Sequence, residues 1–376
     1  MSKNIKDSPF SLIKKISDDS YLTWVKELNK YIVLDLKILT LIVRKKLLSN
    51  SDFLNEISKK LNVGIDIAKS ISNEINDLEL NLNQSSSNAH KPSSQILLDC
   101  SNDYFYSFNS VTIKVSFDSE DTRRLVDPKF SHLQINNTDN FSVHYSIFIL
   151  NKLIYLFKNN EIVGAWNKNE MHEFQGKFSM EFLCSSYNNS EHDWMGVFHA
   201  STILKNNKSI MFTGDSGNGK STLVTILMAN GYNIIADDFT PILRSDLKTY
   251  CFPMAISIKE KSFDLIELLH PQIKDLDQYY IDEIKGHVKY LPPVTDKIKA
   301  NCNSVVWVKY GKDLDNNLEK ISTENALQKF LPDAWISNQE VNAKAFMKWV
   351  TQTNFYELKY SDNKKLISLV DSLFLD

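Results

Sequence analysis

The pattern of hydrophobic and polar residues near the start of the chain predicts a β-hairpin. The segment TWVKELNKYIVLD contains two extended runs on either side of Asn29, a residue that favours turns. A mainly apolar run over 37–48 then predicts a helix. A hairpin that leads directly into a helix indicates a small domain that combines strands and helices.

Two further helices are predicted in the same region. Ser51 can cap the first, in which apolar residues recur every fourth position until Gly64 supplies a stop. The second starts near Asp66 and carries a single apolar stripe, which must pack against its neighbours. The apolar positions of the two helices are Phe53, Ile57, Leu61, Ile67, Ile71, Ile75 and Leu78. A hairpin with three short helices predicts a winged-helix-like domain over residues 1–82.

The composition changes after this domain. Residues 83–95 are rich in Ser and Asn, include Pro92 and contain no large apolar residue, which is typical of a domain linker. From Ile96 to about Phe198, short alternating runs such as SVTIKVSF and NFSVHYSIFIL predict a β-rich layer.

From Lys208 onward, the order of elements is strand, loop, helix and strand. SIMFT is the first strand, TLVTILMAN the helix, Gly231 its stop and YNIIADD the second strand, which together predict a β-α-β unit. Later strands are predicted at 255–259, 304–309 and 355–360, and later helices at 324–331, 341–350 and 364–374. The sequence therefore predicts a multidomain protein with α+β and α/β parts.

The loop of the β-α-β unit carries the strongest chemical signal. It matches G-x-x-x-x-G-K-[ST], after a strand and before a helix, as this phosphate-binding motif requires. Its glycines let backbone N–H groups face a phosphate, and the helix adds its positive N-terminal end. The lysine would reach the β- and γ-phosphates of ATP and act in catalysis, and the serine hydroxyl would bind Mg²⁺. The predicted nucleotide-binding residues are Gly214, Asp215, Ser216, Gly217, Asn218, Gly219, Lys220, Ser221 and Thr222.

A glycine turn that matches the motif by chance is the alternative. At average glycine content, such a match is expected in on the order of one in a hundred chains of this length. This chain has only 10 Gly in total, and positions 214, 217 and 219 are among them. The pattern therefore favours a nucleotide site.

Asp237 and Asp238 end the strand that follows the P-loop helix. Because ligands of open α/β sheets gather at the carboxyl ends of the strands, both carboxylates are expected beside the P-loop. One could hold Mg²⁺ and the other could accept a proton from an attacking hydroxyl, and adjacent like charges tend to raise one pKa. We assign Asp237 to the metal with Ser221, and both aspartates to catalysis. The alternative is an Asp-Asp pair that only starts a loop.

The overall composition excludes several classes of function. The chain has 43 Lys and Arg against 46 Asp and Glu, so it carries no broad basic field for nucleic acid or an anionic membrane. Its four cysteines lie far apart, which indicates neither a zinc site nor a disulfide framework. The N-terminus lacks the apolar core of a signal peptide, and no apolar run is long enough for a membrane span. We expect a cytoplasmic protein.

The run HASTILKNNKSIMFTGDSGNGKSTLVTILMANGYNIIADDFTPI resembles the catalytic core of the HPr kinase/phosphorylase superfamily, which is related to the ATP-dependent phosphoenolpyruvate carboxykinases. The spacings of the histidine, the GDSGxGKS loop and the ADD triplet agree with that core. The resemblance implies a kinase core over 199–376, with 96–198 as the β-rich part of the same module. A lone histidine is more often structural than catalytic, but the resemblance implies that His199 lies at the active site and that Asp238 or Asp237 acts on the acceptor hydroxyl.

Beyond this core, FPMAISIKEKSFDLIE and GHVKYLPP resemble segments of a looser group related to HPr kinases. In true HPr kinases, an acidic residue in an E-I-R-G signature helps to hold the metal. Glu283 stands in EIKG, but it lies farther from Asp238 than in that signature, so we do not assign it to the metal. Lys259 and Lys289 could meet phosphate in a closed site, although solvated surface lysines are commoner.

The N-terminal segments TWVKELNKYIVLDLKILTLIVRKKL and FLNEISKKLNVGIDIAKSISNEINDLEL are similar to the small peptide-binding chaperone of pyrroloquinoline quinone biosynthesis and to its fused relatives. That family binds the leader of a precursor peptide as an added strand at the edge of its hairpin. The resemblance implies a peptide-recognition domain over 1–82. Winged-helix DNA-binding modules share this outline, but the near-balanced charge of the region argues against DNA.

Together these features predict an ATP- and Mg²⁺-dependent kinase. Its acceptor would be a Ser or Thr hydroxyl of a peptide or protein captured by the N-terminal domain, in the biosynthesis of a modified peptide. The alternatives are a kinase for a small metabolite such as a hydroxy-amino acid, an ATP-gated peptide-binding module without catalysis, and a transcriptional regulator. Assembly into a homo-oligomer and use of pyrophosphate or of the reverse reaction stay open.

Overall fold

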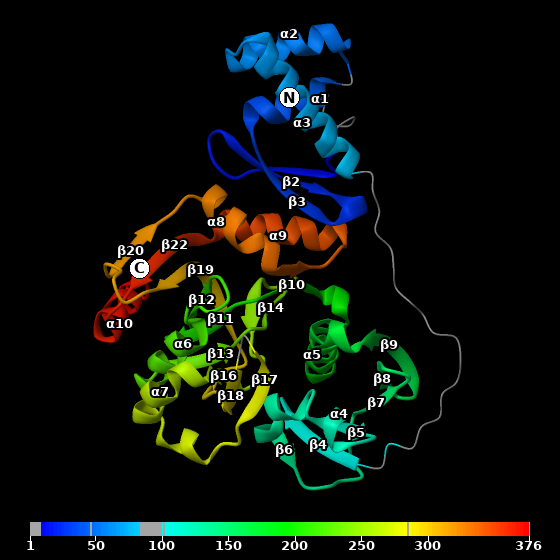
Figure 1. Cartoon of the computed structure of the whole chain (residues 1–376), viewed down its shortest axis with the longest axis vertical. Helices are drawn as coiled ribbons and strands as arrows, with labels where there is room; N and C mark the ends of the chain where they lie inside the picture. Colours follow the sequence, from blue (N-terminus) through cyan, green and yellow to red (C-terminus); the bar gives the residue numbers. More distant parts are fainter. Residues whose placement is uncertain (1–8, 46, 83–99, 101, 284–285, 376) are drawn as a thin grey trace.

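The computed structural model describes residues 9–45, 47–82, 100, 102–283 and 286–375. Over these residues the chain is a mixed α/β protein with four sheets. Figure 1 shows the N-terminal strands and helices at one end of the long axis and the larger sheets at the other. The predicted linker over 83–95 lies outside the described residues.

The N-terminal sheet is antiparallel and has the strand order β1-β2-β3. Its elements and the helices that follow are β1 (Leu12–Lys15), β2 (Ser20–Val25), β3 (Lys30–Asp35), α1 (Leu36–Lys45), α2 (Asn50–Leu61) and α3 (Ile65–Leu82). The hairpin around Asn29 is confirmed by the pairing of β2 with β3, whereas β1 is absent from the prediction. The prediction that Ser51 caps α2 is wrong, because the side chain of Ser49 accepts the hydrogen bond from the backbone N–H of Asp52.

A six-stranded sheet with the order β6-β4-β5-β7-β8-β9 forms the next part. Its elements and the adjoining helices are β4 (Asn102–Phe108), β5 (Val111–Phe117), α4 (Glu120–Arg123), β6 (Gln134–Ile135), β7 (Val143–Leu150), β8 (Leu153–Lys158), β9 (Glu161–Asn167) and α5 (Met171–Tyr187). The predicted strands are confirmed, but the prediction lacks α5. Phe174, Phe178 and Phe182 are buried at four-residue spacing, a helical signal in the sequence.

The largest sheet carries the P-loop. Its main path runs β13-β11-β12-β19-β15-β14-β10-β21, and β22 pairs with β19 and β20. The strands are β10 (Trp194–Phe198), β11 (Ser201–Lys205), β12 (Lys208–Thr213), β13 (Asn233–Ala236), β14 (Thr240–Leu243), β15 (Lys248–Tyr250), β19 (Lys299–Tyr310), β20 (Asn317–Lys320), β21 (Ala334–Ile336) and β22 (Asn354–Tyr360). Since β12, β19 and β22 are parallel, their carboxyl ends meet at one edge, where the P-loop begins.

Helices cover both faces of this sheet. One face shares a core with α6 (Lys220–Ala229), α7 (Phe263–Leu269), α10 (Asn363–Ser372) and a small sheet of order β16-β18-β17. The strands of the small sheet are β16 (Ile256–Lys259), β17 (Tyr279–Asp282) and β18 (Gly286–Leu291). The other face packs against α8 (Thr323–Phe330) and α9 (Glu340–Gln352). The predicted later strands and helices are confirmed, with ends shifted by a few residues.

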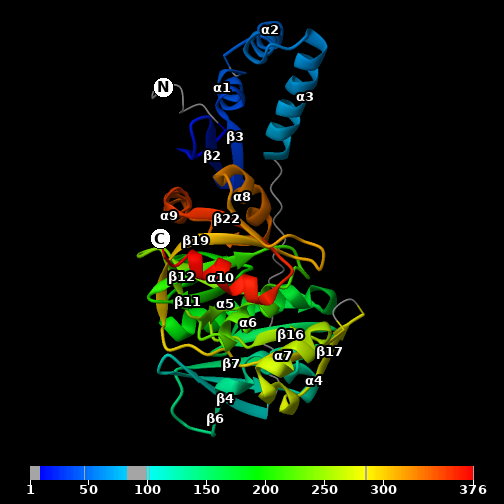
Figure 2. The same cartoon turned by 90° about the vertical axis from the view of Figure 1, so that its left-hand side faces the viewer.

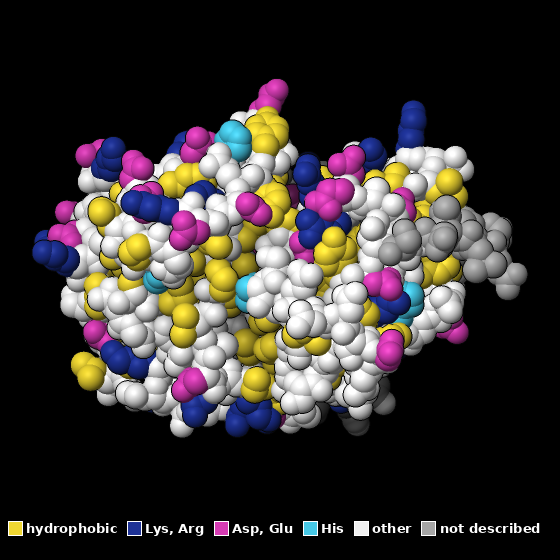
Figure 3. Space-filling model, turned by 90° about the horizontal axis from the view of Figure 1, so that it is seen from below, with side chains coloured by type: hydrophobic (Ala, Val, Ile, Leu, Met, Phe, Trp, Pro, Cys, Tyr) yellow, Lys and Arg dark blue, Asp and Glu magenta, His cyan; other side chains and the backbone are white. Residues whose placement is uncertain are grey.

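The six-stranded sheet and the P-loop sheet share one hydrophobic core. Phe178 and Phe182 of α5 lie in it together with Phe252, which follows β15, and Phe182 lies 6.2 Å from Phe252 between ring centroids. Figure 3 shows the face opposite the N-terminal end, where hydrophobic side chains gather in a hollow between charged borders. The β-rich layer is therefore packed directly onto the P-loop sheet.

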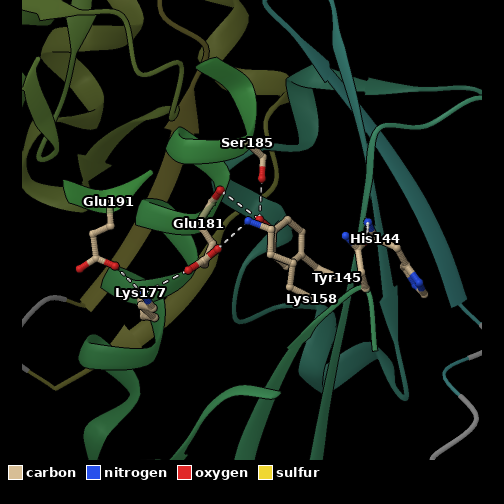
Figure 4. A network of polar contacts seen from close by, with 8 residues as sticks. His144, Tyr145, Lys158, Lys177, Glu181, Ser185 and Glu191 are labelled. Atoms are coloured by element: carbon tan, nitrogen blue, oxygen red, sulfur yellow. Dashed lines mark hydrogen bonds and ion pairs between the residues drawn. The ribbon is translucent and has the colours of Figure 1, made fainter. Parts of the chain in front are cut away.

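A charged network fastens α5 to the six-stranded sheet (Figure 4). The Nζ of Lys158 in β8 lies 3.0 Å from a carboxylate oxygen of Glu181, and Lys177 contacts Glu181 at 3.1 Å and Glu191 at 2.6 Å. The hydroxyl of Tyr145 donates to the backbone carbonyl of Glu181 at 3.0 Å. These contacts hold the helix in place over strands β7 and β8.

The N-terminal sheet docks onto α8 and α9 (Figures 1 and 2). Trp24 is fully buried in a core that includes Phe346 of α9. Asn29 accepts a hydrogen bond from Trp24 Nε1 at 2.9 Å and donates one to the carbonyl of Ile336 in β21 at 2.6 Å. The N-terminal unit is therefore hydrogen-bonded to β21, which pairs with β10, the strand that ends just before His199.

Replacement of Asn29 should loosen this docking. Asn29 has φ of 49°, which glycine adopts readily, so Asn29→Gly removes the side chain without backbone strain. The buried indole N–H of Trp24 would lose its partner at a cost of about 1–3 kcal/mol. We expect the amides of β2 and β3 to exchange faster in hydrogen-exchange mass spectrometry. Asn62→Gly, at φ of 55° on the exposed end of α2, is the matched control and should leave that exchange unchanged; equal exchange in both variants would contradict the role of Asn29.

Candidate functional site

The backbone of the P-loop has the shape that its glycines permit. Gly214, Gly217 and Gly219 all have positive φ, at 152°, 93° and 82°. A Cβ built on Gly214 would lie 2.7 Å from the carbonyl oxygen of Val308 in β19, so the loop could not leave the sheet in this way with a larger residue. Thus Gly214 is needed for the close approach of the loop to β19, whereas Gly217 and Gly219 serve the positive φ of the loop backbone.

Lys220 lies inside the loop that it follows. Its side chain is 6% exposed, and its Nζ donates to the carbonyl of Gly214 at 2.8 Å. Within the described part of the chain, no carboxylate lies within ion-pair distance of this ammonium. The charge of Lys220 is therefore available to an anion that enters the loop.

Asp237 is held by hydrogen bonds from three separate segments. Ser201 of β11 donates to one carboxylate oxygen, Ser221 of α6 lies 3.2 and 3.0 Å from the two oxygens, and the backbone N–H of Ser257 in β16 also donates to the carboxylate. Complete burial and, to a lesser degree, the charge of Asp238 raise the pKa of Asp237 to about 7, against the opposing effect of these donors. Asp237 is thus a buried carboxyl whose pKa lies close to neutral pH.

Asp238 occupies a different environment from its neighbour. Its φ of 60° is unusual for a residue with a Cβ, although aspartate tolerates it better than most, and such conformations cluster at functional sites. Its side chain is 34% exposed, and Oδ1 lies 3.8 Å from Nε2 of His199. On the small sheet, burial, then the charges of Tyr279 and Asp238, raise the pKa of Tyr290 to about 12. An accessible carboxylate beside a histidine can accept a proton from an incoming group.

The residues present fit a magnesium ion that is shared with phosphate. Among the described residues, no group of three or more His, Cys, Asp or Glu side chains gathers as a metal site of its own. Ser221 and Asp237 supply one hydroxyl and one carboxylate in direct contact. Mg²⁺ usually binds through one or two carboxylates, with substrate phosphates and water as its other ligands. This pair would hold it once a nucleotide is bound.

The other residues named by the sequence analysis differ in their exposure and in their contacts. Asp215 and Ser216 are exposed at the tip of the loop, and the hydroxyl of Thr222 lies 3.0 Å from that of Ser262. Glu283 is exposed in the turn after β17. Lys289 donates to the carbonyl of Ile273 at 2.8 Å and lies over the ring of Phe263, so its ammonium is already engaged.

Three residues of the site are missing from the sequence prediction. Ser201 and Ser257 hold Asp237, and Tyr290 lies near Asp238. Ser201 begins β11 two residues after His199, so it lies close to a predicted site residue along the chain. The sequence has no comparable signal for Ser257 or Tyr290, because their proximity depends on where the small sheet packs.

The comparisons with known proteins give little beyond a distant likeness. No protein-family model matches this chain, and no curated protein does. Among solved structures, it is similar to the Hpr(Ser) kinase/phosphatase from Coxiella burnetii, with a TM-score of 0.24 and 12% sequence identity over 48% of this chain and 96% of that chain. Residue roles therefore rest on the contacts described above. Among the described helices, none is long and apolar enough to cross a membrane.

The raised pKa of Asp237 should make the protein less stable as the pH rises. Between the ordinary aspartate pKa of 3.8 and the folded value of about 7, the native state keeps a proton that the unfolded chain releases, so the free energy of unfolding falls with pH. Asp237→Asn cannot ionise and should be more stable than the native chain above pH 7, by a few kcal/mol at about 1.4 kcal/mol per pKa unit. The difference should shrink towards pH 4.

Urea denaturation at several pH values measures this difference. Asp215→Asn, which removes an exposed carboxylate of the same loop, is the matched control and should show a difference that does not depend on pH. If Asp237→Asn also differed from the native chain by a constant amount, Asp237 would have an ordinary pKa.

Proposed function

We propose that this chain is a kinase that transfers the γ-phosphate of ATP to a hydroxyl group. One observation carries the proposal: Ser221 of the P-loop helix is hydrogen-bonded to buried Asp237, and the next residue, Asp238, is partly exposed beside His199. The residues proposed to bind phosphate, to bind the metal and to act as the base would thus lie next to one another. The P-loop sequence alone would fit any nucleotide-binding protein. The combination of buried Asp237 with partly exposed Asp238 favours transfer to an acceptor.

Nucleotide binding would use the loop and the first turn of α6. Backbone N–H groups between Gly214 and Ser221 would face the β-phosphate, with the positive end of the helix behind them. Lys220 would exchange the carbonyl of Gly214 for phosphate oxygens, which is a short movement for a side chain already inside the loop. Ser221 and Asp237 would hold Mg²⁺, which offsets negative charge on the phosphates during transfer.

Asp238 would act on the acceptor. It would accept the proton of the attacking hydroxyl while a new bond forms between that oxygen and the γ-phosphorus. The bond from this phosphorus to the bridging oxygen breaks, and ADP leaves with the electron pair. His199, whose Nε2 faces Asp238, would orient this carboxylate. Asp237 would not serve as this base, because it is completely buried.

The acceptor that we propose is a Ser or Thr hydroxyl of a peptide or protein bound by the N-terminal unit. Among the described strands, β3 pairs with β2 alone, so its other edge carries backbone groups that an extended peptide could pair with. The unit is also joined to the site, since Asn29 binds β21 and β21 pairs with β10. A peptide held at β3 would thus be tethered to the body that carries Asp238.

Two substitutions should separate binding from chemistry. Lys220→Ala should abolish transfer and greatly weaken ATP binding, because the loop loses its cation. Asp238→Asn should still bind ATP but lose about 10²- to 10⁴-fold in turnover, the usual contribution of proton transfer. Calorimetry with ATP and a steady-state assay measure the two effects. Lys208→Ala, at the exposed start of β12, is the control for loss of a lysine; near-native turnover of Asp238→Asn would refute the role of Asp238.

Intact-mass analysis should identify the acceptor. Candidate peptides encoded beside the gene, incubated with ATP, Mg²⁺ and the native chain, should gain one phosphate, and peptides with every Ser and Thr replaced by Ala should gain none. Peptides that lack their leader should react more slowly, because β3 no longer holds them. Equal rates with and without the leader would contradict delivery by the N-terminal unit and favour a small hydroxyl compound, and no transfer beyond that of Lys220→Ala would contradict kinase activity.

A further inference from the structure

Lys259 is a lysine without a partner at the edge of the candidate site. It ends β16 and is half-buried, yet within the described part of the chain its ammonium forms no hydrogen bond or ion pair. The neighbouring carboxylate of Glu260 lies 3.2 Å from Nδ1 of His287 rather than near Lys259. A half-buried ammonium without a counter-ion has a charge that can serve a bound anion.

The segment that carries Lys259 is fixed to the P-loop helix and to Asp237. Two residues before it, the backbone N–H of Ser257 donates to the carboxylate of Asp237. Three residues after it, the hydroxyl of Ser262 lies 3.0 Å from that of Thr222, in the first turn of α6. Lys259 therefore lies between two contacts to the residues that would surround the phosphates.

The side chain of Lys259 lies on the face of β16 away from the hydrophobic core. Ile256 and Ile258 are buried in the core shared with α6 and α7, and side chains alternate along a strand, so Ser257 and Lys259 lie on the other face. With a rise of about 3.3 Å per residue, the Cα atoms of these two residues are about 7 Å apart. The flexible four-carbon stem of the lysine is long enough to cover that distance.

The two lysines in this part of the fold have different surroundings. Lys289 pairs across the strands with Ile258, and its ammonium is bound to backbone carbonyls on the α7 side. Lys259 pairs with Val288 and has no such contact. The P-loop supplies Lys220 near the β- and γ-phosphates, but nothing else in the loop carries positive charge. Any second cation at the phosphates would have to come from outside the loop, and the face of β16 carries Lys259.

We propose that Lys259 is a second phosphate-binding cation, which contacts the γ-phosphoryl oxygens of ATP during transfer. This inference rests on the proposed function. Negative charge remains spread over the three peripheral oxygens of the phosphoryl group while the bond to ADP breaks and the bond to the acceptor forms. The ammonium of Lys259 would offset part of this charge. ADP lacks the γ-phosphate, so its binding would not involve Lys259.

Paired affinities for ATP and ADP test this role without knowledge of the acceptor. Calorimetry of the full-length chain with Mg²⁺ should show that Lys259→Ala binds ATP about tenfold more weakly, as expected for one lost charged contact of about 1.4 kcal/mol, and binds ADP as the native chain does. Lys259→Arg should retain most of the preference for ATP. Lys261→Ala, two residues away and exposed, is the matched control and should behave as the native chain.

Once an acceptor is known, the turnover number provides a second test of the role of Lys259. Loss of one charge that stabilises the transition state should lower kcat by about 10²- to 10³-fold in Lys259→Ala. An unchanged ratio of ATP to ADP affinity, or an equal loss of affinity for both nucleotides, would overturn the role of Lys259 and leave the proposed function standing. If the native chain itself bound no ATP, the proposed function would fail, and the role of Lys259 with it.

Discussion

The carboxyl of Asp237 joins the parts of the site that are most distant in the sequence. It follows β13 and receives hydrogen bonds from Ser201 in β11, Ser221 in α6 and the backbone of Ser257 in β16. A buried carboxyl without donors would be costly, so each of these segments is held where it can donate. Together with the shared hydrophobic core and the contact of Thr222 with Ser262, this side chain fixes the P-loop helix relative to the small sheet that carries Lys259. Burial raises the pKa of this carboxyl, and a bound metal cation would lower it again.

The two faces of the P-loop sheet carry different parts of the molecule. On one face, α6 and the small sheet adjoin the P-loop, and on the other, α8 and α9 carry the N-terminal unit. Strand β10 connects the two, because it pairs with β21 and ends one residue before His199. Phe198, the last residue of β10, lies 5.3 Å from Trp349 of α9 between ring centroids. This arrangement links the N-terminal sheet, through α9 and β21, to the strand that precedes His199.

Local features of the chain were predictable from sequence, whereas contacts between distant segments were not. The P-loop follows from its glycines, since the positive φ of Gly217 and Gly219 is encoded by residue type. The helix α5 is missing from the prediction although its phenylalanines have helical spacing, because flanking strand signals dominated that region. The hydrogen-bond donors to Asp237 could not be predicted from sequence, because Ser257 approaches it only through the packing of β16 against α6. For the same reason, sequence alone could not distinguish Lys259 from a solvated lysine.

The proposed function requires that a nucleoside triphosphate binds in the P-loop with its γ-phosphate towards Asp238. A crystal structure of the full-length chain with Mg²⁺ and an ATP analogue that cannot transfer its γ-phosphate would show this arrangement. We expect phosphates enclosed between Gly214 and Ser221, Lys220 moved from the Gly214 carbonyl to the phosphates, and Mg²⁺ beside Ser221 and Asp237. An analogue bound elsewhere, or a γ-phosphate that points away from Asp238, would contradict it.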